Sequence, residues 1–170
     1  MAAKIHTALI YRFVLKEILI SVLLTITLTP LRAQVIINEV MAYNTSTIQN
    51  PVGGDYTDWM EIRNTGTTDV DLTSWSLSDE PDDLRKWIFP HGTVIGAGKV
   101  LLIWADDQED ASAGFHASFK LRVAGETIYL TGKDGLVEDS LFFSRQFGNI
   151  SFGPDINGIP VYFPHPTPGN

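Results

Sequence analysis

The chain has 170 residues, no cysteine and a formal net charge of −8 at pH 7. This length suits one domain of ordinary size, and the lack of cysteine excludes a fold held together by disulfides. Hydrophobic residues make up 44% of the sequence, which is enough for a core and argues against global disorder.

Residues 1–33 have the arrangement of a secretory signal peptide. Basic residues precede an uncharged apolar run over residues 18–29, which Pro30 ends. This run of 12 residues is shorter than the roughly 20 apolar residues that span a bilayer. We therefore predict a signal-peptide helix that is cleaved after Ala33. The mature chain would be secreted or held at the cell surface, with no transmembrane segment.

Loss of this leader makes the chain more acidic. Residues 1–33 hold four of the 12 basic residues and one of the 20 acidic ones, so eight basic and 19 acidic residues remain, a net charge of −11. Phosphate binding depends on lysine and arginine, which release counterions from a nucleic acid. The charge therefore argues against a nucleic-acid partner and leaves cations, basic proteins and neutral sugars.

The first strand pattern covers residues 35–42, which are mostly β-branched or apolar and include Asn38 and Glu39. Asn, Thr, Ser, Pro and Gly then dominate residues 43–56, which predicts a long loop. Loops of this length in small β-domains often carry binding residues, and as often they have no such role.

Two further segments, residues 58–64 and 74–79, alternate between apolar and polar side chains. Met60 and Ile62 fall on one side of the first segment. A period of two is typical of a strand with one solvent-exposed face. The turn-rich residues 65–69 between the segments suit an antiparallel connection.

Residues 99–105 are apolar on both faces, which predicts a strand in the middle of the core. Alternation also predicts strands at residues 126–131 and 136–143, joined by a Gly-Lys-Asp-Gly hairpin turn. On the returning strand, Val137 and Leu141 are expected on the same face. Shorter strands are expected at residues 86–89, 93–95, 116–122 and 161–163.

After the leader, no apolar stripe with helical spacing continues for three turns. Short strand patterns separated by Gly, Pro and Asn turns are typical of a β-sandwich or a β-barrel. The sequence therefore predicts an all-β domain.

Five segments carry family motifs in a fixed order: INEVMAYN (37–44), DWMEIRNTG (58–66), VDLTSWSLSD (70–79), KWIFPHGTVIGAGKVLLIWA (86–105) and GETIYLTGKDGLVEDS (125–140). Together they resemble a lamin tail domain of the bacterial, secreted type, and the middle segments are also similar to the tail of nuclear lamins. The resemblance implies an immunoglobulin-like β-sandwich over residues 34–165. Residues 166–170 would then be a C-terminal tail or the start of a linker.

The resemblance also implies a class of function. Nuclear lamin tails bind chromatin and nuclear-envelope proteins, which an exported acidic chain would not meet. Bacterial members occur as modules of secreted or surface proteins, often beside nucleases and other hydrolases. We therefore expect a non-catalytic binding, adhesion or scaffolding module with a protein or glycan partner at the cell surface. Such a module can be accessory to a secreted or surface enzyme.

Four residues are candidates for binding such a partner: Trp59, Glu61, Arg63 and Asn44. Trp59 shares the polar side of its strand with Glu61 and Arg63, so it is the best candidate for an exposed aromatic that stacks on a sugar. The alternatives are structural. Trp59 would pack in the core, Glu61 or Glu39 would face Arg63 across the sheet, and Asn44 would hold its own loop.

Acidic residues gather in two loops, residues 79–83 and 106–110. Carboxylate oxygens are the ligands that calcium prefers, so a calcium-dependent carbohydrate-binding domain is the second hypothesis. The alternative is a solvated surface that keeps an exported domain soluble. The metal candidates are Glu39, Asp58, Asp106 and Asp107.

The three histidines after the leader, His91, His116 and His165, lie in separate segments without a zinc signature. No serine stands in a Gly-x-Ser-x-Gly motif. The chain is therefore predicted not to be an enzyme. A pocket that joins a histidine to a carboxylate with a perturbed pKa would argue against this prediction.

Overall fold

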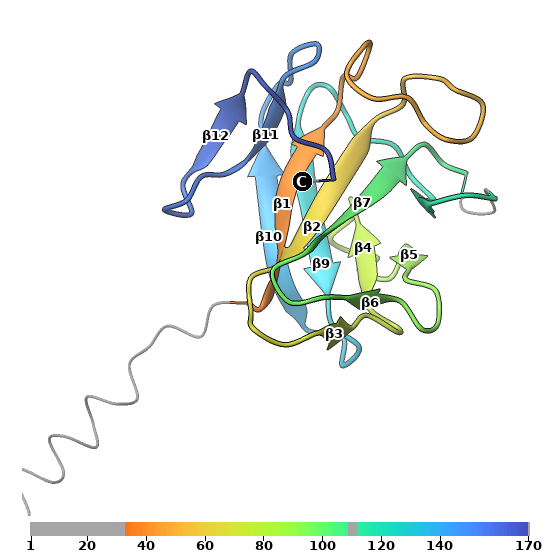
Figure 1. Cartoon of the computed structure of the whole chain (residues 1–170), viewed down its shortest axis with the longest axis vertical. Coiled ribbons are helices and arrows are strands. Elements are labelled where there is room, and N and C mark those ends of the chain that lie inside the picture. The colour runs from red at the N-terminus through yellow and green to blue at the C-terminus, as the bar shows by residue number, and fades with distance from the viewer. Residues whose placement is uncertain (1–32, 109–111, 170) are drawn as a thin grey trace, which may run out of the picture. The chain divides into compact units, whose positions relative to one another are not determined.

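Two β-sheets pack face to face around one hydrophobic core, as Figure 1 shows. The computed structural model describes residues 33–108 and 112–169, and this part of the chain contains strands and no helix. It therefore includes no helix that could cross a membrane. The prediction of an all-β, immunoglobulin-like sandwich is confirmed. The predicted signal-peptide helix falls on residues that lie outside the described part.

The larger sheet has six strands, and all its pairs are antiparallel except β7–β8. Its order is β12 (Pro160–Phe163), β11 (Ser151–Pro154), β1 (Val35–Met41), β2 (Trp59–Asn64), β7 (Val100–Ala105) and β8 (Phe115–Ala117). The smaller sheet has the order β10 (Val137–Phe143), β9 (Glu126–Thr131), β4 (Ser76–Ser78) and β5 (Trp87–Ile88). A separate ribbon pairs β3 (Val70–Asp71) with β6 (Val94–Ile95).

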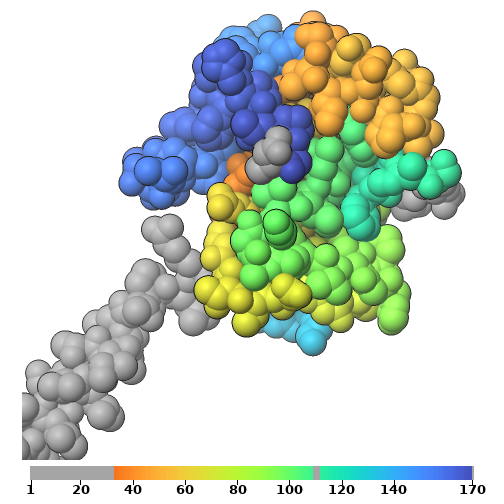
Figure 2. Space-filling model, viewed as in Figure 1, coloured from red at the N-terminus to blue at the C-terminus, as the bar shows by residue number. Residues whose placement is uncertain are grey.

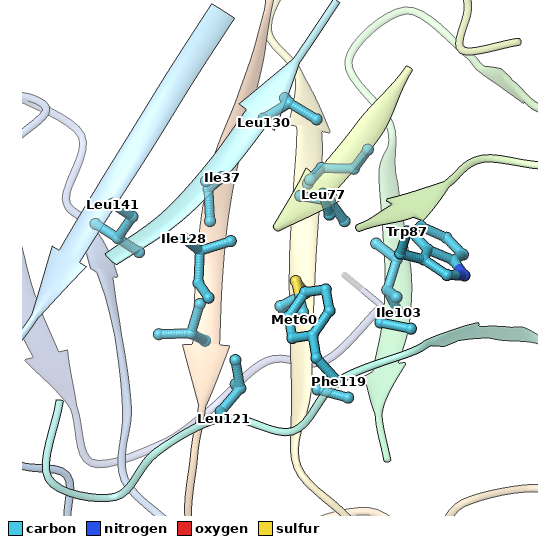
Figure 3. Close-up of a cluster of buried hydrophobic side chains, with 14 of the residues drawn as sticks. Ile37, Met60, Leu77, Trp87, Ile103, Phe119, Leu121, Ile128, Leu130 and Leu141 are labelled. Atoms are coloured by element: carbon cyan, nitrogen blue, oxygen red, sulfur yellow. The ribbon is translucent and has the colours of Figure 1, made fainter. Parts of the chain in front are cut away.

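The core lies between the two sheets, and each contributes the apolar half of an alternating pattern (Figure 3). Met60 and Ile62 of β2 point inward, and both are completely buried, as the sequence predicts. Ile128 and Leu130 of β9 face them from the smaller sheet and are equally buried. Burial of an aliphatic side chain of this size stabilises the fold by about 2 kcal/mol, so these alternating residues fix which face of each strand is inside.

The connection between β2 and β4 differs from the prediction. The two strands lie in different sheets, because β1 and β7 already occupy both edges of β2. The chain crosses between the sheets, and the buried Asn64 side chain holds this crossing by donating to the carbonyls of Thr68 (2.7 Å) and Ile95 (3.1 Å). The prediction of a direct antiparallel connection was therefore wrong.

β9 and β10 form the predicted hairpin, but its register shifts at a β-bulge between Val137 and Asp139. Because a bulge adds one residue to one strand, it changes the face that the next side chain occupies. Val137 is exposed whereas Leu141 is buried, so the expectation that they share a face was wrong. The carboxylate of Asp139 instead accepts a hydrogen bond of 2.7 Å from the backbone N–H of Ile37, which ties β10 to β1.

A second, smaller hydrophobic cluster lies on the opposite face of the six-stranded sheet. Met41, Trp59 and Trp104 form it, with Ile48 and Leu102 packed against them. The cluster makes β7 apolar on both faces, as the sequence predicts. It also leaves Trp59 fully buried. The prediction that Trp59 is an exposed aromatic that stacks on a sugar was therefore wrong, and the alternative that Trp59 packs in the core is confirmed.

The loop between β1 and β2 contacts this cluster through Ile48, and side-chain hydrogen bonds from Asn44 hold the loop backbone. Asn44 is 5% exposed, and its amide group donates to the carbonyls of Ile48 (2.7 Å) and Thr57 (2.9 Å). Its side-chain oxygen accepts a hydrogen bond from the N–H of Thr47. Asn44 therefore holds its own loop, which was the structural alternative for this residue.

The hairpin of β11 and β12 closes one edge of the larger sheet. Aromatic packing attaches it, because the ring of Tyr162 lies 5.0 Å from that of Phe152 and 5.6 Å from that of Phe147, centroid to centroid. Pro154 and Pro160 face each other at the end of the pair.

The substitution Gly153→Ala is expected to destabilise the fold. A Cβ at this position would overlap the carbonyl oxygen of Asn38 on β1, and neither backbone can move without breaking the sheet. We expect the free energy of unfolding to fall by about 2 kcal/mol or more, as in other overpacked sites. Urea denaturation would measure the loss.

Gly148→Ala is the matched control, because a Cβ there meets only the ring of Tyr43 at 3.6 Å, an ordinary contact. Its effect is expected to stay within about 0.5 kcal/mol. Equal effects of the two substitutions would contradict the close approach of β11 to β1.

Candidate functional site

A cavity of about 340 Å³ lies where the β1–β2 loop meets the end of β7. It brings Asp58 and Asp106, two of the predicted site residues, to one place although 47 positions separate them in the sequence. The lining residues are Asp55, Tyr56, Thr57, Asp58, Ala105, Asp106, Gln108 and Lys120.

Asp58 is the residue immediately before β2, and it lines the cavity. Burial raises the pKa of this carboxyl from 3.8 to about 6. A hydrogen bond from the backbone N–H of Asn44 and the positive charge of Lys120 act in the opposite direction and favour the ionised form. Asp58 is therefore a carboxylate that lacks sufficient positive partners in the described structure.

Asp106 follows β7 directly and is almost completely buried, with 2% of its side chain exposed. Its Oδ2 accepts a hydrogen bond from Nδ2 of Asn50 (2.6 Å) and is hydrogen-bonded to Nδ1 of His116 (2.9 Å). Its other oxygen, Oδ1, is buried and has no hydrogen-bond partner among the described residues. A buried carboxylate oxygen without a donor is costly, so it marks a position where a ligand donor would be stabilising.

The Asn50–Asp106–His116 network was not anticipated from the sequence. Asn50 lies in the β1–β2 loop and His116 in β8, so only the parallel pairing of β8 with β7 brings the histidine beside Asp106. The sequence around His116 carries no local signal for this pairing, because β7 and β8 meet only in the folded sheet.

The histidine beside Asp106 fits a structural role. Both ring nitrogens are occupied, since Nδ1 contacts Asp106 and Nε2 contacts the carbonyl of Ala113 at 2.8 Å. The carbonyl can only accept, so Nε2 carries a proton and has no lone pair for a general base. His116 also does not line the cavity. His116 therefore supports Asp106 from outside the cavity lining.

The cavity carries an excess of negative charge. Asp55, Asp58 and Asp106 provide three carboxyl groups, against the ammonium group of Lys120 in the lining and the imidazole of His116 behind Asp106. Lys120 is paired with Asp106 through a backbone β-bridge, so its position on the cavity wall is fixed by the chain. This arrangement favours a ligand that brings N–H donors and positive charge.

The remaining candidates of β1 and β2 lie elsewhere, on the outer face of the six-stranded sheet. Glu39 and Glu61 face each other across the two strands, because a register shift between Ile37 and Glu39 brings them together. The expectation that either faces Arg63 across the sheet was wrong, since Arg63 pairs with Ile36 and is exposed. Burial raises the pKa of Glu61, and a hydrogen bond from the N–H of Gly169 partly opposes this shift.

The four metal candidates do not form one cluster. Glu39 lies on the outer sheet face, whereas Asp58 and Asp106 line the cavity. Asp107 is exposed, with a φ of 63°, and its N–H donates to the carbonyl of Ala117. Within the described ranges, no three His, Cys, Asp or Glu side chains are grouped as metal ligands. In the other acidic loop, Lys86 pairs with Asp79 and Glu80 at 2.8 and 2.5 Å.

The raised pKa of Asp58 makes the stability of the fold depend on pH. Between pH 3.8 and about 6 the folded chain holds this proton more tightly than the unfolded chain, so ionisation of Asp58 lowers stability as the pH rises through about 6. Asp58→Asn removes this effect. We expect the variant to gain about 1 kcal/mol relative to wild type between about pH 5 and pH 8, after allowance for solvent screening. Urea denaturation at the two pH values would measure it.

Asp155→Asn serves as a control with the opposite sign. The pKa of Asp155 is lowered, first by the hydrogen bond from the N–H of Ile159, so its contribution to stability is present above pH 3.8 and is lost below it. Its substitution should therefore cost the same at about pH 5 and pH 8. If Asp58→Asn were also independent of pH over this range, the raised pKa of Asp58 would be refuted.

The model of the Lamin Tail Domain family matches residues 29–144, well over half of the chain. Strands β11 and β12 and the C-terminal segment lie beyond the matched region. No curated protein matches the chain significantly. Domains of this family are generally non-catalytic, immunoglobulin-like modules for protein interaction. From this match and the sandwich described above, the chain belongs to the lamin tail domain family.

Proposed function

We propose that this protein is an exported, non-catalytic interaction module of the bacterial secreted type, which binds a basic side chain of a partner protein in the cavity beside Asp58 and Asp106. The leader pattern of residues 1–33 supports export to the cell surface or the medium. Membership of a family of protein-interaction domains supports a protein partner. The acidic surface suits a role as an accessory to a basic secreted or surface enzyme.

The observation that carries the proposal is the incomplete hydrogen bonding of the cavity carboxylates. Oδ1 of Asp106 is buried without a donor, and Asp58 has a pKa raised to about 6 by burial. An arginine guanidinium presents five N–H donors in a planar arrangement, enough to serve both carboxylates at once. Hydrogen bonds between ionised groups are about twice as strong as those between neutral groups.

A calcium-dependent carbohydrate-binding domain is the second candidate function. It is favoured by the same two carboxylates, because Asp58 and Asp106 face one cavity and one oxygen lacks a partner. The ammonium group of Lys120 in the lining opposes it, since a lysine repels a divalent cation. This second function requires the metal before any glycan binds.

Titration with N-acetyl-arginine amide, followed by NMR, tests the first function. We expect chemical-shift changes at the cavity lining with a dissociation constant of about 1 mM, and about tenfold weaker binding to Asp58→Asn. N-acetyl-citrulline amide is the matched ligand, because it keeps the shape of arginine without its charge. Binding should also weaken as the pH falls through about 6, where Asp58 takes up its proton.

Two further variants check that charge in the cavity is responsible. Lys120→Gln should strengthen arginine binding, because it removes the one positive group of the lining. Asp82→Asn makes the same charge change as Asp58→Asn outside the lining and should leave binding unchanged. Equal binding of the citrulline ligand, or equal losses in Asp58→Asn and Asp82→Asn, would refute the proposal.

Thermal unfolding with calcium and with a chelator distinguishes the second function. A ligand that binds only the folded state raises the melting temperature, by an amount that grows with its concentration over its dissociation constant. A rise that Asp58→Asn abolishes would support a calcium site in the cavity. The absence of any shift at about 10 mM calcium would exclude the second function, because extracellular modules bind this ion at about 0.1–1 mM.

A further inference from the structure

The chain after β12 lies across the outer face of β1 and β2 (Figure 2). In Figure 1 the dark blue chain after β12 passes in front of these two strands. The segment is residues 164–169, in which proline alternates with His165, Thr167 and Gly169. Proline has no N–H, so this segment carries backbone donors only at alternate positions. The segment is irregular, with a bend at residues 164–165 and a turn at residues 168–169, where Gly169 has a φ of 81°.

The donors at residues 167 and 169 are both used. The N–H of Thr167 donates to Oε1 of Glu39 (3.3 Å), and its hydroxyl donates to Oε2 (3.2 Å). The N–H of Gly169 donates to Oε2 of Glu61 at 2.7 Å. Glu39 therefore binds Thr167, and Glu61 binds Gly169, the next non-proline residue.

The spacing of the acceptors explains this match. Glu39 and Glu61 are cross-strand partners on neighbouring strands, which lie about 4.8 Å apart in a sheet. The turn at residues 168–169 places the N–H of Gly169 at Glu61 while that of Thr167 stays at Glu39, so the two N–H groups reach neighbouring strands. A segment with every N–H present would leave the intervening donor without a partner, and proline removes that donor.

The sheet holds both carboxylates in place from below. Glu61 accepts a hydrogen bond of 2.7 Å from Nδ2 of Asn38, and Glu39 accepts one from the hydroxyl of Ser151. Both glutamates are buried, with 3% exposure for Glu39 and none for Glu61. Two buried, adjacent carboxylates repel each other and are stabilised only by donors, which the C-terminal segment supplies.

The segment itself is held lightly. Thr167 and Gly169 are exposed, and Pro166 and Pro168 on either side of Thr167 are only partly buried. Its polar attachment consists of the hydrogen bonds to Glu39 and Glu61. An attachment of this kind can open while the sandwich stays folded.

We propose that Glu39 and Glu61 form a peptide-binding site for segments in which proline alternates with an N–H-bearing residue, and that residues 164–169 are its exchangeable occupant. The ligand in trans is the same segment of a second copy of this chain. The site lies on the outer sheet face, lined by other residues than the cavity beside Asp58, and does not depend on what the cavity binds.

The first experiment opens the site in the full chain. Thr167→Pro together with Gly169→Pro removes both N–H donors, and Gly169 has a φ of 81° that proline cannot adopt. A labelled peptide with the sequence of residues 162–170 is then titrated by fluorescence anisotropy. We expect saturable binding to this variant and at least tenfold weaker binding to the wild-type chain, whose own segment competes at an effective concentration of about 1 mM or more.

Two peptides test which groups are recognised. A peptide with Thr167→Val keeps the N–H and should still bind, whereas one with Thr167→Pro and Gly169→Pro should not. Absence of saturation up to about 10 mM, equal binding to wild type and to the opened variant, or binding of the doubly substituted peptide would each overturn the proposal.

The second experiment tests exchange between copies. The opened variant is mixed with a Glu39→Gln, Glu61→Gln variant, which keeps the donor segment but has a weakened acceptor site. We expect a heterodimer in sedimentation velocity, with neither variant dimeric alone. If the glutamine variant does not fold, the opened variant mixed with wild-type chain replaces the pair. Absence of any complex at concentrations that saturate the peptide would refute exchange with a second copy.

Discussion

Burial of both faces of β2 is the constraint on which the rest of the structure depends. Met60 and Ile62 face the core between the sheets, while Trp59 and Glu61 face outward and are buried as well. The second face needs its own cover, which the β1–β2 loop provides over Trp59 and the C-terminal segment provides over Glu61. The long loop and the tail therefore both cover this face, and both polar regions arise where this cover meets the sheet.

The sequence predicted the features that follow from local alternation. The predictions of which side chains of β2 and β9 point inward, and of two apolar faces on β7, were correct. A period of two in the sequence indicates which side of a strand is buried. It could not predict that Trp59 is covered, since the covering residue Ile48 comes from an irregular loop. The β10 bulge and the shift at Glu39 were missed for a related reason, because one added residue changes the pairing without changing the composition.

The candidate site was predictable only in part. Asp58 and Asp106 were selected for their charge, and they do share one cavity, whereas Glu39 and Asp107 have other surroundings. The partner that sets the orientation of Asp106, His116, depends on the parallel pairing of β7 and β8. Contacts between segments far apart in the chain set hydrogen bonding at a buried carboxylate, and a single sequence does not encode them in any local pattern.

The prolines of the β11–β12 hairpin have a consequence for crowded surroundings. β12 is the outermost strand of the larger sheet, and Pro160 faces Pro154 at its end. A sheet edge normally offers a row of free N–H groups that can recruit another chain and begin aggregation. Proline lacks that group, and Pro164 follows immediately after the strand. The hairpin thus ends the sheet at an edge that is a poor template for further strands, which protects the fold from edge-to-edge polymerisation.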